Sequence, residues 1–267
     1  MAILRLSDLV RGFCPNERVP GSARLIFWGG WAAIFFTLWV FGAPKLVPRP
    51  LPVLDAFVNM ALSGALLEGL LSSIETNAKA IFFATLLTLP ISYLTVLAVM
   101  EPVATVVTKA RFLGLTGLTF LFTILIGGGT TLKVTLVTFG ITVFFVSSVV
   151  SIVMSIPKDE FDHARSLGMK EWKVVWHVVV IGRLDQVVEQ MSINAAIGWV
   201  MLTMVEGLVR SDGGLGAMLL NDNKQFKIEN IFAIQFTIMM VGLGMDYAFR
   251  WGHRLAFPYA HLTLERK

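Results

Sequence analysis

The chain has 267 residues, of which 55% are hydrophobic and only 15% are charged. A soluble domain of this length would carry about 25% charged residues, so the composition excludes a disordered chain and argues strongly against a soluble enzyme. The formal net charge of +4 indicates basic cytoplasmic loops rather than a nucleic-acid surface. The single cysteine, Cys14, excludes a disulfide within the chain.

Six apolar segments have the length of membrane-spanning helices, for which about 20 residues are needed. In lipid the backbone must satisfy its own hydrogen bonds, and the segments are too long for barrel strands, so all of them are predicted to be helical. The fold class is therefore an all-α, six-span membrane protein. The expected division is an N-terminal segment 1–24, a transmembrane domain 25–255 and a C-terminal tail 256–267. The six segments are residues 25–43, 77–100, 111–127, 133–156, 187–209 and 230–250.

Basic residues predict the orientation, because cytoplasmic loops carry an excess of Lys and Arg. With the N-terminus inside, fifteen of the 22 basic residues fall on the inner side, so both ends are predicted to be cytoplasmic. Four prolines between 44 and 52 are expected to end the first helix and form an extended outer segment. Pro90 should kink the second span, and Gly127–Gly129 should form a tight outer turn.

The longest inner connection, residues 157–185, has a helical pattern of its own. Pro157 followed by two acids predicts a helix start, with Phe161, Ala164 and Leu167 on one face and Gly168 ending the helix. A second amphipathic helix is predicted next. Its apolar face is formed by Trp172, Val175, Trp176 and Val179, and its polar face by Lys170, Lys173 and His177. Tryptophan and lysine in this pattern are typical of a helix at the membrane surface.

The run Asp162-His163-Ala164-Arg165-Ser166-Leu167-Gly168 resembles the EAA loop of permease subunits of bacterial ABC importers. Ala-Arg-Ser-Leu-Gly is similar to the form found in the nitrate/sulfonate/taurine branch. The resemblance extends over residues 45–255, through Pro48–Leu54, Thr88-Leu89-Pro90, Gly198-Trp199-Val200 to Glu206, and Gly213–Gly216. His163 departs from the motif, and so does Val180-Ile181, where Leu-Pro is expected.

This resemblance implies a transport subunit of an inner-membrane importer that works by alternating access. It implies two copies of a separate ATPase, which bind ATP and Mg²⁺, and a second permease copy, forming a homodimer or a heterodimer with a related chain. It also implies a periplasmic or lipid-anchored binding protein and a small anion or sulfonate as substrate. The chain has no phosphate-loop motif, and no cofactor of its own is expected. The implied ATPase-coupling residues are Asp159, Glu160, Phe161, Asp162, His163, Ala164, Arg165, Leu167 and Gly168.

Ionisable and polar residues within spans usually face a cavity or a partner. Glu206, near the outer end of the fifth span, is interpreted as a gate or structural residue. Ser192, Asn194 and Thr203 are candidates for the pathway or for interhelical hydrogen bonds. Two i, i+4 pairs, Glu75 with Lys79 and Asp246 with Arg250, are interpreted as structural pairs, the first at the outer boundary. Lys133 and Arg210 on the outer face are consistent with an anionic substrate.

A membrane-embedded enzyme or a channel is the alternative of a different class. The four histidines, His163, His177, His253 and His261, lack metalloprotease spacing. No catalytic or metal-binding residues are therefore predicted.

Overall fold

The computed structural model describes residues 21–42, 44, 47–209 and 213–258, and every regular element in these ranges is helical. The chain forms two compact units, residues 1–58 and 59–267, which are described separately. Most of the N-terminal segment 1–24 and of the tail 256–267, together with Arg210 and His261, lies outside the described residues.

The first unit contains helix α2 (Gly21–Thr37), which continues as a π-helical turn from Leu38 to Gly42. Residues 23–42 are long and apolar enough to cross a membrane, which agrees with the first predicted span. The extended proline segment is wrong in part, because helix α3 (Pro50–Leu62) begins at Pro50. Proline is tolerated in the first helical turn, where its missing N–H would have no helical partner.

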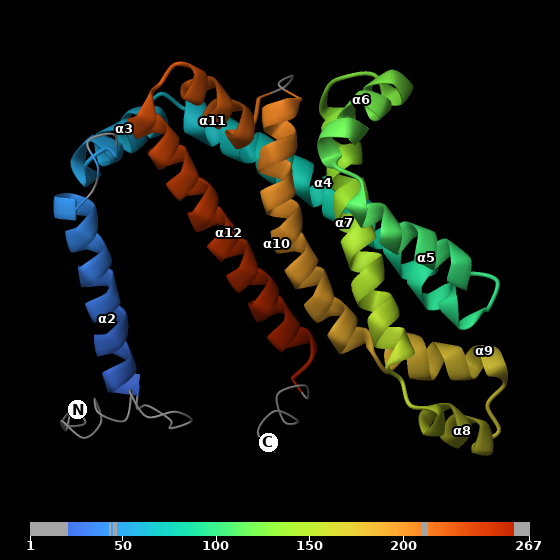
Figure 1. The fold of residues 1–267 in the computed structure, drawn as a ribbon. Coiled ribbons are helices and arrows are strands. Elements are labelled where there is room, and N and C mark those ends of the chain that lie inside the picture. The colour runs from blue at the N-terminus through green and yellow to red at the C-terminus, as the bar shows by residue number, and fades with distance from the viewer. Residues whose placement is uncertain (1–20, 43, 45–46, 210–212, 259–267) are drawn as a thin grey trace. The chain divides into compact units, whose positions relative to one another are not determined.

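The second unit contains nine α-helices within its described residues (Figure 1). Helices α7, α10 and α12 run between an end that bears α6 and α11 and an end that bears α8 and α9. We call these the α11 end and the α8 end. The helices are α4 (Ala65–Tyr93), α5 (Glu101–Lys109), α6 (Leu115–Ile126), α7 (Thr130–Met154), α8 (Lys158–Ser166), α9 (Glu171–Val174), α10 (Leu184–Leu208), α11 (Leu215–Lys224) and α12 (Ile228–Ala256).

Among the described residues, five helices are long and apolar enough to cross a membrane, and a bent pair supplies a sixth span when it is counted as one. The pair joins Glu101–Phe112 to Leu115–Ile126 at an angle of 113°. The third span predicted over 111–127 therefore corresponds to the second helix of this bent pair, which begins at Leu115. The backbone is extended at Leu113 (ψ 122°) and Gly114 (ψ 130°), which interrupts the helical hydrogen bonds.

The second span also differs from its predicted bounds of 77–100. Helix α4 begins at Ala65, after Gly64 in the left-handed region (φ +77°), and includes Pro90. A short 3₁₀ turn prolongs it to Val96, and Leu97 is extended. The helix therefore extends over Glu68 and Glu75, which precede the predicted span, because charged residues do not end a helix. The Gly127–Gly129 turn between α6 and α7 is confirmed, with φ of +90° and +88° at its two ends.

The core lies where α7 packs against α4 and α10. Leu136, Val146 and Leu202 are fully buried there. Gly198 on α10 permits the close approach, because a Cβ on it would lie 2.5 Å from Ile141 Cδ1 of α7. The neighbouring Trp199 Nε1 donates a hydrogen bond of 3.0 Å to the Ile238 carbonyl of α12. The absence of a side chain at Gly198 thus lets α7 and α10 pack closely.

Replacing Gly198 by valine is expected to destabilise the bundle by about 1–3 kcal/mol, because overpacking forces α7 and α10 apart. The measurement is the thermal unfolding of the purified protein in detergent. Gly244→Val on α12 is the matched control, since a Cβ there meets no atom within 4 Å. Equal unfolding midpoints for the two variants would contradict the close packing.

Candidate functional site

The loop of residues 157–185 at the α8 end begins with the predicted short helix. Pro157 is extended (ψ 144°) and stands just before α8. After α8, Gly168 adopts φ +77°. Its N–H donates to the Arg165 carbonyl at 2.9 Å, and the Met169 N–H donates to the Ala164 carbonyl at 3.4 Å. This is a Schellman motif, in which a left-handed residue, usually glycine, closes the helix. The predicted role of Gly168 as a helix terminator is confirmed.

The predicted faces of the two loop helices hold only in part. On α8, Ala164 is buried and Phe161 half-buried, but Leu167 is 64% exposed. After α9 the chain is π-helical from Val175 to Ile181, so the spacing of side chains differs from that of an α-helix. Val174 and Val179 are the buried residues of this stretch, whereas two tryptophans of the predicted apolar face are exposed, and their place at the membrane surface stays a prediction. These tryptophans are Trp172 and Trp176.

Ion pairs fix α8 against the segment that follows. The Arg165 guanidinium donates to Glu171 through Nε (2.9 Å) and Nη2 (3.1 Å), and to Asp162 through Nη1 (2.8 Å). Arg183 donates to Glu160 at 2.5 Å. The hydrogen bonds from Arg165 hold the pKa of the exposed Glu171 carboxyl below its ordinary value. The pair therefore contributes above the unfolded-state pKa of Glu171, and this contribution disappears as the pH falls through the lowered pKa.

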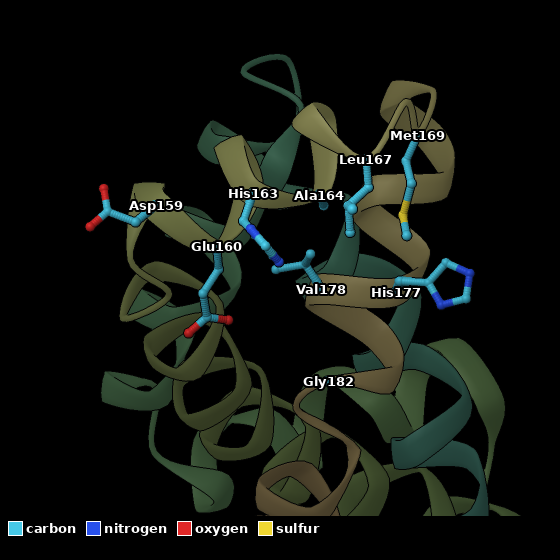
Figure 2. A pocket seen from close by; sticks show the side chains of 9 residues that line it. All are labelled: Asp159, Glu160, His163, Ala164, Leu167, Met169, His177, Val178 and Gly182. Atoms are coloured by element: carbon cyan, nitrogen blue, oxygen red, sulfur yellow. The ribbon is translucent and has the colours of Figure 1, made fainter.

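A hollow of about 460 Å³ lies between α8 and the π-helical segment (Figure 2). His163 and Val178 face each other across it, and Glu160, Ala164 and Leu167 complete the α8 side. The hollow is mainly apolar with ionisable groups at its edge. Five of the nine predicted coupling residues, Asp159, Glu160, His163, Ala164 and Leu167, therefore line one feature of the molecule.

Glu206 is the centre of a buried polar cluster at the α11 end. Its side chain is fully buried, and its carboxylate accepts hydrogen bonds from Ser73 Oγ (2.7 and 3.0 Å) and from the Gly216 N–H (2.9 Å). Ser73 Oγ in turn accepts the Leu215 N–H at 2.9 Å. The carboxylate thus caps the N-terminus of α11, where the helix dipole favours negative charge. One acid connects α10, α4 and α11.

Lys133 belongs to the same cluster and is only 1% exposed. Its Nζ donates to the Gly213 carbonyl at 2.8 Å, and its charge interacts with that of Glu206. Lys133 is therefore a buried partner in the Glu206 cluster, and its position on the outer face stays a prediction. Gly214 and Gly216 make room for the cluster, because their Cβ atoms would lie 2.4 Å from the Glu206 carboxyl and 2.1 Å from the Thr203 carbonyl.

The other predicted pathway residues do not gather around Glu206. Asn194 is buried and donates to the Gln190 carbonyl of its own helix at 2.8 Å, while its Oδ1 has no hydrogen-bond partner among the described residues. Thr203 is half-buried and donates to the Val200 carbonyl at 2.8 Å. Ser192 is also half-buried. Of the four candidates, Glu206 alone joins helices that are distant in sequence, and nothing in the sequence near Ser73 indicated its partner.

A second hollow, of about 510 Å³, lies between α4 and the first half of α7. Lys79 and four threonines supply its polar groups, and Lys79 pairs with Glu75 at 2.6 Å. The predicted pair is confirmed, but it borders a hollow rather than standing alone. The other predicted pair, between Asp246 and Arg250, is also present. The threonines are Thr130, Thr131, Thr135 and Thr138.

A chain with five or six apolar spans and a capped helical loop at one end has the features of an importer permease. Residues 71–251 match the model of the family described as "Binding-protein-dependent transport system inner membrane component", and the chain belongs to this family. It is therefore a multi-pass inner-membrane protein and the permease component of an ABC importer. This role is one of transport, in contrast to the alternative of a membrane-embedded enzyme.

Similar proteins agree with this assignment. The taurine transport system permease protein TauC of Escherichia coli (strain K12) is 24% identical over 261 residues, which cover 91% of this chain and 92% of TauC. A putative ABC transporter permease protein of Methanocaldococcus jannaschii is 21% identical over 229 residues, covering 76% of this chain and 80% of that protein.

Among solved structures, inward-facing conformations of the MetNI methionine ABC transporter contain a chain with a TM-score of 0.62 to this one. That chain is 15% identical, and the match covers 71% of this chain and 95% of that one. At this identity the likeness concerns the fold alone.

Replacing Glu206 by alanine is expected to cost about 3–5 kcal/mol, because it leaves a buried cation and several buried donors without their acceptor. The measurement is the thermal unfolding midpoint in detergent. Glu189→Ala is the matched control, since Glu189 lies on the same helix and is exposed. A Glu206→Ala variant as stable as the control would show that the cluster does not stabilise the bundle.

Proposed function

We propose that this permease moves a small anion, of the sulfonate class, into the cell by alternating access. In this proposal both chain ends are cytoplasmic, so that the α8 end faces the cytoplasm and the α11 end faces the periplasm. The observation that carries the proposal is the α8 loop, a capped, polar helix that projects at the end of the bundle rich in basic residues. The family assignment and the relative named for taurine support the same function.

Helix α8 and the adjacent hollow form the surface on which a separate ATPase docks. Seven of the nine residues of α8 are polar or charged, yet Ala164 and the ion pairs of Arg165 and Arg183 hold the helix in place. A rigid, hydrated helix is suited to transmit movement from a partner. ATP and Mg²⁺ are bound by that partner, and two copies of it serve two permease chains. The two permeases are a homodimer, with a related second chain as the alternative, and a periplasmic or lipid-anchored binding protein delivers the substrate.

An anionic substrate is supported by the hollow between α4 and α7. A lysine within a membrane span is costly in lipid, so it faces a cavity or a partner. Here the Lys79 ammonium, the threonine hydroxyls and the first turn of α7 border one space. A cation, hydroxyl donors and a helix N-terminus are the groups that bind an anion. Ser192, Asn194 and Thr203 remain candidates for other positions along the pathway.

Replacing Gly168 by valine is expected to reduce copurification of the ATPase subunit, because a β-branched residue is strained at φ +77° and shifts α8. The measurement compares the amount of ATPase recovered with the affinity-tagged permease from membranes. Gly168→Asn is the control, because asparagine tolerates the left-handed region. If both variants retain the ATPase and transport at the unmodified level, the docking role of α8 is refuted.

Replacing Lys79 by methionine is expected to raise the KM for the transported anion about tenfold, since a hydrogen bond to a charged group contributes about 1.5–3 kcal/mol. Uptake into proteoliposomes that contain the ATPase and the binding protein is measured with nitrate, taurine, alkanesulfonates and pyrimidines. Lys79→Arg keeps the charge, and Lys109→Met removes an exposed lysine far from the hollow. A preference for cations or peptides would refute the proposal of an anionic substrate. An unchanged KM for Lys79→Met would show that Lys79 does not contact the substrate.

A further inference from the structure

Helix α11 ends in a turn that has the same backbone as the end of α8. The Phe226 N–H donates to the Asn223 carbonyl at 3.2 Å, and the Lys227 N–H donates to the Asp222 carbonyl at 3.0 Å. These bonds form a Schellman motif with Phe226 at the left-handed position, at φ +53°. In the part of the chain that the structure describes, Phe226 is the one residue other than glycine with a positive φ.

A phenylalanine is unfavourable at this position for two independent reasons. First, its Cβ strains the left-handed backbone, whereas glycine would make the same two hydrogen bonds without strain. Second, its side chain is 83% exposed and gains almost nothing from burial within the chain. Backbone strain of this kind persists at functional sites more often than elsewhere.

The residues around the ring are polar. Residues 221–225 are all polar, and most of them are exposed together with Lys227. Such a polar turn belongs in water, because its side chains would be costly in hydrocarbon. The ring of Phe226 therefore stands in solvent, flanked by the exposed Lys224 and Lys227. None of the ion pairs among the described residues involves these two lysines.

We propose that Phe226, Lys224 and Lys227, which we call the Phe226 turn, form the anchor on which the substrate-binding protein docks. The ring would enter an apolar pocket, and the lysines would meet carboxylates on its rim. Phenylalanine is among the aromatic residues enriched at protein–protein interfaces, and residues that fill a well-packed pocket of the partner are typical hot spots. This inference rests on the proposed function, in which the α11 end faces the periplasm and receives a binding protein.

The position of the turn favours this partner over others. It lies at the end of the bundle opposite α8, where the ATPase is proposed to dock (Figure 1). The N-terminus of α11 is fixed to α4 and α10 by the Glu206 cluster. A partner that holds the Phe226 turn thus contacts a helix rigidly connected to the transport core.

The test is titration of the permease–ATPase complex in nanodiscs with its fluorescently labelled substrate-binding protein. Phe226→Gly is expected to raise the Kd at least tenfold while the unfolding midpoint stays unchanged or rises. Phe226→Trp is expected to retain tight binding. Phe112→Gly, which removes another highly exposed phenylalanine, is the matched control and should leave the Kd unchanged.

Several outcomes would overturn the proposal. Equal Kd values for Phe226→Gly and the unmodified complex would refute the docking anchor alone, whereas failure of the unmodified complex to bind would refute the proposed function as well. A lower unfolding midpoint for Phe226→Gly would show that the ring stabilises the folded chain, which would explain its presence without a partner. Quenching of the Phe226→Trp fluorescence by brominated lipids would place the ring in the bilayer instead.

Discussion

The buried carboxylate of Glu206 is the constraint on which the α11 end depends. A charge without partners is not tolerated in a membrane protein interior, so Glu206 requires the Ser73 hydroxyl and the Gly216 N–H, with the charge of Lys133 nearby. Each partner comes from a different element. Glycine is then obligatory at positions 214 and 216, because any side chain there would occupy the space of the carboxylate or of the α10 backbone. One acid therefore sets the positions of three helices.

The two ends of the bundle use similar local structures for different surroundings. At the α8 end, Gly168 closes a short helix without strain, and ion pairs of Arg165 and Arg183 hold that helix in water. At the α11 end, the hydrogen bonds of Glu206 fix the N-terminus of α11, and the turn after its C-terminus contains Phe226 in a strained backbone conformation. Between the ends, the small residue Gly198 lets α7 and α10 approach closely. The ends are thus polar and rigid, as partner surfaces on a membrane protein require.

The sequence predicted α7, α10 and α12 well, because long apolar runs leave no alternative to a spanning helix. It predicted α4 and α6 poorly. The predicted span begins at residue 77, although the helix already includes Glu68 and Glu75. The extended backbone at Gly114 ends the helix before α6, although the predicted span 111–127 is mostly apolar. The π-helical stretch from Val175 to Ile181 changes which side chains share a face, since a spacing rule for α-helices does not apply to it.

Candidate site residues were predictable where the information was local. The α8 loop follows from Pro157, the acids after it and Gly168, all within twelve residues. The partners of Glu206 were not predictable, since Ser73 lies 133 positions away and belongs to an unremarkable apolar run. The left-handed conformation of Phe226 could not be predicted for another reason. Sequence patterns detect left-handed turns through glycine or asparagine, so a turn that uses a residue disfavoured there leaves no signal until its backbone is known. Such a residue, being costly to the fold, requires an explanation outside the fold, and the exposed ring of Phe226 points to a partner.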